Sequence, residues 1–175
     1  KKNSANQTSS GLDRDYITQW SYGIDETWTL LIPNAKGGAS FPLVQSEKAM
    51  SKANPEFMQL YQQLGQYWGN QPGTSGPVYV GAFVLMLFFL GLFLLKGPMK
   101  WALYAATVLS VLLSWGRNFM WFTDLFLDYV PMYAKFRTVA SILVIAEFTI
   151  PLLAMMALKK LIDNPEVLKE TETMK

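Results

Sequence analysis

The sequence predicts an all-α membrane protein: three transmembrane helices and an interfacial amphipathic helix, preceded by a mixed, mostly helical or irregular extracytoplasmic segment. Two observations predict this class. Apolar residues make up 51% of the chain, yet residues 1–77 hold six basic and six acidic residues and no long apolar run. After residue 77 the apolar residues form long blocks bordered by Trp, Tyr and Lys, which are typical of membrane interfaces. We therefore expect an extracytoplasmic segment at 1–77, a transmembrane region at 78–158 and a cytoplasmic tail at 159–175.

Segment 1–77 is expected to be a mixture of short elements. The stretch "TWTLLIP" at 27–33 predicts either a short strand or a buried turn of helix. Asn54 before Pro55 predicts a helix start, because Asn is a favoured N-cap and Pro fits the first helical turn. The modest apolar content of the segment indicates that it packs against the rest of a larger protein.

Three apolar blocks predict the transmembrane helices. The first, 78–95, has eighteen uncharged residues, and the third, 138–158, is interrupted only by Glu147. The middle helix, 99–122, must continue through Arg117, whose long side chain can reach the interface. A hydrocarbon core of about 30 Å needs about twenty helical residues, which these blocks nearly or fully provide. The alternative for the same blocks is the buried helical core of a soluble protein.

Lysine positions predict the orientation in the membrane. Lys96 and Lys100 follow the first block, and Lys159 and Lys160 follow the third. Three crossings place both pairs on one side, which the positive-inside rule makes cytoplasmic. Residues 1–77 and the loop 123–137 then lie outside.

The stretch from Arg117 to Tyr129 predicts an amphipathic helix that lies in the interface. Helical spacing divides it into a polar face and an apolar face. The polar face holds Arg117, Trp121, Asp124 and Asp128, and the apolar face holds Phe122, Leu125, Phe126 and Tyr129. Asp124 and Asp128 have the spacing of an acid/base pair, although such pairs also occur on plain solvated faces.

Glu147 is an acidic residue in the middle of the third apolar block. A carboxylate inside a bilayer costs about 2.5–3.5 kcal/mol or more, so we expect it to face other helices or a wet cavity rather than lipid. Pro151 removes the helical donor of the Glu147 carbonyl and should bend the helix there. Two alternatives are open: a protonated side chain bonded between helices, with Thr107, Ser110 or Ser114 as partners, or a residue of a substrate or headgroup cavity.

Basic residues in the outer loop run against the predicted orientation. Lys135 and Arg137 lie in that loop, and Arg117 lies just before it. One explanation is charge balance against Asp124 and Asp128. The other is an anionic ligand at the outer face of the membrane, since arginine offers a planar fork of donors to phosphate.

Composition excludes several classes of site. The chain has no Cys and no His, so it offers no disulfide, no Cys/His metal site and no His-based triad. The net charge of +2 is too small to indicate a nucleic-acid partner. We expect no metal and no cofactor.

Four stretches resemble a known family. They read "WSYGIDETWTLLIPNAKGG", "GQYWGNQPGTSGPVYVGAF", "KGPMKWAL" and "LSWGRNFMWFTDLFLDYVPMYAKFRTVASILVIAEF". Together they resemble the YfhO family of bacterial multi-pass membrane proteins, in the form typical of Bacteroidetes, over nearly the whole chain. The resemblance implies an internal section of a longer protein in the cytoplasmic (inner) membrane, surrounded by lipids and further transmembrane helices.

The resemblance also implies an activity. YfhO proteins resemble GT-C glycosyltransferases, which transfer sugar from a polyprenyl-phosphate donor outside the cytoplasmic membrane, here to a cell-envelope glycan or lipid. The catalytic acid of such enzymes is expected outside this section, which alone would be inactive. Phosphate-binding candidates are Lys135, Arg137 and Arg117, and candidate sugar contacts are Asp25, Glu26, Asp124 and Asp128. The alternative is a transporter or flippase with Glu147 as an intramembrane relay.

Overall fold

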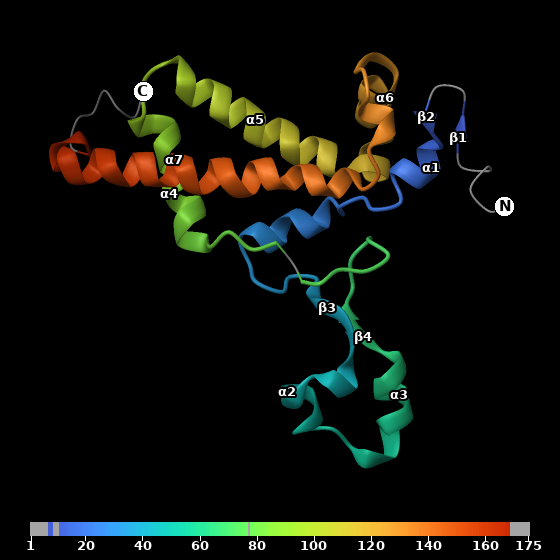
Figure 1. Cartoon of the computed structure of the whole chain (residues 1–175). Helices are drawn as coiled ribbons and strands as arrows, with labels where there is room; N and C mark the ends of the chain where they lie inside the picture. The colour runs from blue at the N-terminus through green and yellow to red at the C-terminus, as the bar shows by residue number, and fades with distance from the viewer. Residues whose placement is uncertain (1–6, 9–10, 77, 169–175) are drawn as a thin grey trace.

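The computed structural model describes residues 7–8, 11–76 and 78–168, and the described chain is mostly helical (Figure 1). Its long helices are α4 (Ala82–Leu94), α5 (Pro98–Ser114) and α7 (Val144–Asp163), with the 3-10 turn η6 (Val139–Leu143) leading directly into α7. α5 and α4 both pack on α7, and α4 crosses α7 in the view of Figure 1. The other elements are short and belong to the segment before α4 or to the connection between α5 and α7.

The segment before α4 divides into a part that lies on the helices and an arm that projects away from them (Figure 1). The part on the helices comprises the antiparallel pair β1 (Gln7–Thr8) and β2 (Gly11–Leu12), then α1 (Arg14–Ile17) and η1 (Asp25–Leu30). The arm comprises β3 (Gly37–Pro42), η2 (Leu43–Gln45), α2 (Glu47–Met50), η3 (Pro55–Phe57), α3 (Met58–Gln63) and β4 (Gly65–Tyr67). β3 and β4 pair antiparallel, so the arm begins and ends at the same place beside the helices.

In this segment one prediction is confirmed, and a choice between two alternatives is decided. Asn54 caps η3 by accepting a hydrogen bond from the backbone N–H of Glu56, with Pro55 as the first helical residue. The stretch "TWTLLIP" forms a helical turn rather than a strand, because it falls largely within η1. Leu30 of that turn is buried against the long helices.

Only one helix of the described chain is long and apolar enough to cross a membrane. It is the continuous helical stretch Val139–Asp163, of 25 residues. α4 has 13 residues and α5 has 17, or about 20 and 25 Å at 1.5 Å per residue, against a hydrocarbon core of about 30 Å. The helices predicted at 78–95 and 99–122 are therefore longer than α4 and α5, the helices that the structure contains there. The third helix begins where predicted but runs five residues past 158, so Glu147 lies in its first half rather than at its middle.

The predicted helix through Arg117 is wrong because the chain breaks at Gly116. Gly116 has a φ of +46°, a left-handed conformation that ends α5 and begins the 3-10 turn η4 (Gly116–Phe119). α6 (Met120–Tyr129) then runs in a new direction and ends just before Pro131, as predicted. Arg117 precedes α6 and does not share its polar face.

α6 has the predicted amphipathic character. Asp124 and Asp128 lie one turn apart, and Trp121, Leu125 and Tyr129 are exposed aromatic or apolar side chains. On its other side, aromatic rings contact one another in sequence: Phe119 stacks on Phe122, and tilted contacts join Phe122 to Phe126 and Phe126 to Tyr133. The 3-10 turn η5 (Tyr133–Lys135) follows and leads to η6.

The helices pack through small residues and hydroxyl groups. Ala146 and Ala157 of α7 have no exposed surface, and a Cβ on Gly91 of α4 would lie 3.4 Å from that of Ala157. The Thr107 hydroxyl of α5 bonds that of Thr149 of α7 at 2.7 Å. Close approach of backbones through small residues, joined by interhelical hydroxyl bonds, is a packing mode common inside membranes.

Lys100, which in the sequence served only to predict the orientation in the membrane, also has a structural role. It is 9% exposed, and its ammonium donates a 2.9 Å hydrogen bond to the carbonyl of Leu92, near the end of α4. A cation there satisfies a free carbonyl and interacts favourably with the helix dipole. Its position is therefore explained by helix capping, without reference to the predicted orientation in a membrane.

Candidate functional site

A polar cavity of about 270 Å³ lies where the segment before α4 meets the first turns of the α7 helix. It is lined by residues from three regions of the sequence: residues 22–36, residues 67–78 and residues 138–147. Those that supply its polar groups include Tyr22, Glu26, Thr29, Tyr67, Ser141 and Glu147. Carboxylates, phenols and aliphatic hydroxyls make this wall rich in hydrogen-bonding groups.

Backbone hydrogen bonds hold the segment before α4 in this place. The N–H of Tyr22 donates to the carbonyl of Ser114 at the end of α5, over 2.8 Å. The N–H of Ala140 donates to the carbonyl of Trp20 over 3.0 Å. These bonds tie residues 20–22 to the end of α5 and to the start of the α7 helix. The cavity therefore sits at the end of the molecule where the predicted outer loop also lies.

Glu26 is the buried centre of the site, with 2% of its surface exposed. Its carboxylate accepts hydrogen bonds from the N–H of Gly23 at 2.5 Å, from the N–H of Asn70 at 3.4 Å and from the Tyr67 hydroxyl. All three donors are neutral, so hydrogen bonds rather than an ion pair satisfy the carboxylate. Burial, with the hydrogen bond to Glu26, raises the pKa of Tyr67 and keeps its proton available for that bond.

Tyr22 extends this network. Its hydroxyl bonds the Thr29 hydroxyl, which in turn donates to the Glu26 carbonyl at 2.7 Å. Burial raises the pKa of Tyr22 to about 12, and the neighbouring charges of Glu26 and Glu147 act in the same direction. Tyr22 therefore stays protonated at neutral pH between two carboxylates.

Glu147 lines the same cavity from α7, and its side chain is exposed in this chain. It lies eight residues into the helical stretch, about 12 Å along the axis at 1.5 Å per residue. The hydroxyls considered as its partners are engaged elsewhere: Thr107 with Thr149, Ser110 with the Ile142 carbonyl and Ser114 with the Val111 carbonyl. Of the two alternatives for Glu147, this arrangement favours the cavity. α7 continues as one helix through Pro151.

Asp25 and Glu26, adjacent in the sequence, point to different surroundings. Asp25 is exposed and forms an ion pair with Lys36. The hydrogen bond from Lys36 lowers the pKa of Asp25. Of the four candidate sugar contacts, only Glu26 lines the cavity.

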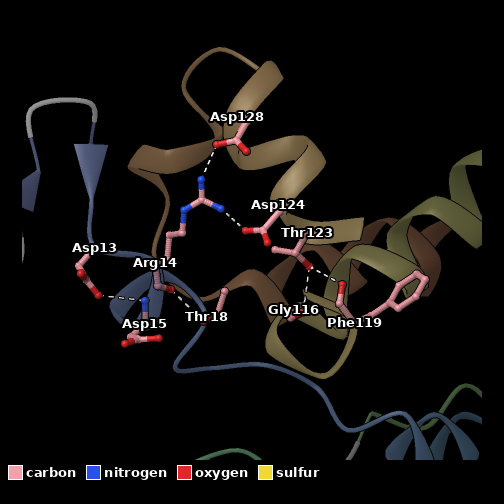
Figure 2. Close-up of polar contacts among 9 residues, drawn as sticks. All are labelled: Asp13, Arg14, Asp15, Thr18, Gly116, Phe119, Thr123, Asp124 and Asp128. Carbon is pink, nitrogen blue, oxygen red and sulfur yellow. Dashed lines mark hydrogen bonds and ion pairs between the residues drawn. The ribbon is translucent and has the colours of Figure 1, made fainter. Parts of the chain in front are cut away.

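Asp124 and Asp128 are placed away from the cavity, where both bind Arg14 (Figure 2). One guanidinium nitrogen contacts Asp124 and the other contacts Asp128, which fastens α1 to α6. Side-chain exposures of 37–51% keep each pair at less than about 1 kcal/mol. The Thr123 hydroxyl fixes the start of α6 by donating to the Gly116 carbonyl at 2.9 Å (Figure 2). In this arrangement the two carboxylates hold α1 against α6 through Arg14.

The three candidate phosphate ligands do not share a partner. Arg117 donates to the Asn70 carbonyl at 2.9 Å, and the Arg137 guanidinium lies 4.8 Å from the centre of the Tyr16 ring. Lys135 is exposed at the end of η5. Lys135 closes this 3-10 turn, so residues 135–137 do not form one continuous extended segment. Charge balance of Arg137 against Asp124 and Asp128, one of the two explanations considered, is not what the structure shows, because Arg14 pairs with both acids.

Sequence reasoning missed the tyrosines of the site. Tyr67 lies 41 residues from Glu26, and no spacing rule joins residues of an irregular segment over that distance. Within the described residues, no group of three or more His, Cys, Asp or Glu side chains is placed to hold a metal ion. The chain matches no protein-family model, no curated protein and no solved structure.

Proposed function

We propose that this chain belongs to a multi-pass protein of a bacterial cytoplasmic membrane that binds a lipid-linked sugar at the outer face. Following the resemblance to YfhO, we propose that the whole protein is a GT-C-like glycosyltransferase that uses a polyprenyl-phosphate sugar to modify a cell-envelope glycan or lipid. The observation that carries the proposal is the position of the polar cavity. It opens beside the first turns of a helix that is long and apolar enough to span a membrane.

The outer surface of that helix supports a membrane setting. Only 39% of its most apolar stretch is buried within the chain. Val144, Phe148 and Met155 are all at least 60% exposed. Helices that are apolar and this exposed contact either lipid or further helices of a membrane bundle.

The lining of the cavity supports a sugar rather than a phosphate as its ligand. Ionised carboxylates accept hydrogen bonds, and sugar hydroxyls donate them. Glu26 and Glu147 would repel a phosphate, and Lys36 is already paired with Asp25. A phosphate linked to that sugar would then lie at the rim, where Arg137 directly precedes the cavity residue Thr138.

The membrane part of the proposal is tested by labelling from the two sides of the membrane. Ser51 on the arm and Asn164 after α7 are both exposed, and the chain has no native Cys. With an odd number of crossings between them, cysteines at these positions should react with an impermeant maleimide from opposite sides of inverted and right-side-out vesicles. Labelling of both from one side would contradict the three-crossing topology.

The binding part is tested with farnesyl phosphate, bare or linked to glucose, mannose or galactose, and the full chain in lipid nanodiscs. At least one hexose-linked probe should bind about tenfold or more tightly than the bare one, which is the scale of one charge-assisted hydrogen bond. Glu147→Gln should abolish this preference, and Glu56→Gln on the arm should preserve it. Arg137→Ala should weaken all probes about tenfold by removing a phosphate contact. Equal affinity for bare and hexose-linked probes would refute the sugar site.

The alternative, a transporter or flippase, requires Glu147 to act as a relay within the membrane. A relay needs neighbouring groups inside the helix bundle that pass the proton onward. Here Glu147 faces the cavity, and the hydroxyls of α5 are bonded to other atoms. The structure therefore gives this alternative less support. Proton-coupled uptake by reconstituted protein, lost in Glu147→Gln, would favour it.

A further inference from the structure

A second cavity, of opposite character, adjoins the polar one. It has a volume of about 280 Å³ and lies along η5, η6 and the first turn of α7. Its wall is almost entirely apolar, formed by Tyr133, Phe136, Val139, Ile142, Val144 and Ile145. We call it the apolar groove.

The two cavities share part of their walls. Thr138 and Ser141 line both the polar cavity and the apolar groove. Both carboxylates, Glu26 and Glu147, line only the polar cavity, and Phe136, Ile142 and Ile145 line only the apolar groove. A molecule that occupied both cavities would need a polar end, a junction near two hydroxyl side chains and an apolar end.

The apolar groove also opens toward the surface where a chain from the bilayer would arrive. Phe136 is 66% exposed and Val144 is 60% exposed, so the groove continues into the outward apolar surface of the helix. A hydrocarbon chain could therefore enter sideways from lipid without crossing polar groups. The hydrogen-bonding side chains of the groove wall are three hydroxyls, those of Tyr133, Thr138 and Ser141.

We propose that the apolar groove binds the hydrocarbon chain of an amphiphile whose sugar headgroup occupies the polar cavity, with Thr138 and Ser141 at the junction. This inference rests on the proposed function and adds the place and direction of the lipid chain. It implies that the chain leaves the site along η6 and α7, toward Ile145, rather than along the arm. Burial of each methylene in such a groove contributes favourably, so chain length should affect affinity.

The first test narrows the groove in the full chain. Ile145→Trp places an indole ring in the groove, whereas Met155→Trp places the same ring on α7 outside it, at a position that is 62% exposed. Ile145→Trp should weaken farnesyl phosphate binding about tenfold or more, equivalent to about two methylenes losing contact. Met155→Trp should leave the affinity unchanged. Equal effects of the two variants would overturn the inference.

A second test needs no substitution and covers the case in which Ile145→Trp fails to fold. A farnesyl phosphate analogue with a diazirine in its chain should crosslink to residues 136–145 of the unaltered chain. Crosslinks only to the arm or to the far end of α7 would overturn the inference.

The two proposals fail in distinguishable ways. If hexose-linked probes keep their advantage over bare farnesyl phosphate while Ile145→Trp has no effect, the groove assignment fails and the sugar site stands. If no probe shows an advantage from the hexose, the sugar site itself fails.

Discussion

Replacement of Glu26 with alanine is expected to lower the free energy of unfolding by about 3 kcal/mol or more. The change leaves three donors without their acceptor: the N–H groups of Gly23 and Asn70 and the hydroxyl of Tyr67. Each buried donor that loses its partner costs about 1–3 kcal/mol, partly recovered where water can enter. Because Tyr67 is the last residue of the arm and Asn70 closely follows it, the loss should also loosen the arm where it meets the helices.

The neighbouring acid provides the matched control. Asp25→Ala removes a carboxylate from the same turn, but Asp25 is exposed and its ion pair with Lys36 should contribute less than about 1 kcal/mol. Unfolding of purified protein in mild detergent, followed by tryptophan fluorescence against denaturant, measures both variants. If Glu26→Ala is no more damaging than Asp25→Ala, the hydrogen-bonded carboxylate is not the centre of the site.

The parts of the fold that could be predicted are those set by local chemistry. The cap at Asn54, the end of α6 before Pro131 and the helical nature of residues 138–158 each follow from one residue type or from continuous hydropathy. The length of α5 could not be predicted in this way. Hydropathy continues through "LLSWGRNFMWF", and the break depends on a left-handed Gly116 that tertiary contacts hold in place.

The site was predictable only in part, for a related reason. Glu147 stood out because a carboxylate in an apolar stretch is costly, and the structure places it on a polar cavity. In the sequence, Glu26 was one of several acidic residues that were equally good candidates for the site. Only the folded structure distinguishes it from Asp25 and from the two acids bound by Arg14. Which acids become buried depends on pairings between distant segments, and a single sequence does not record those pairings.

Replacement of Gly116 with alanine is the second change for which we expect a large loss, about 2–5 kcal/mol. The left-handed conformation at φ +46° costs a residue with a Cβ about 1–2 kcal/mol. The new Cβ would also clash with the Ser21 hydroxyl and approach Val139 at 2.5 Å, and overpacking typically costs a further 1–3 kcal/mol. Ser21 accepts the N–H of Arg117 at 2.9 Å, so displacing it breaks the bond that joins residue 21 to η4.

A second glycine separates backbone strain from packing. Gly97, between α4 and α5, also has a positive φ, +106°, but a Cβ there would meet no atom within 4 Å. Gly97→Ala should therefore introduce backbone strain without a clash, whereas Gly116→Ala combines left-handed strain with the clash against Ser21 and Val139. Because Val139 opens the helical stretch whose first turns line both cavities, Gly116→Ala should also reduce the preference for hexose-linked probes, which Gly97→Ala should leave intact. An unchanged preference for hexose-linked probes in Gly116→Ala would mean that the contact of this glycine with Ser21 and Val139 does not position the wall of the polar cavity.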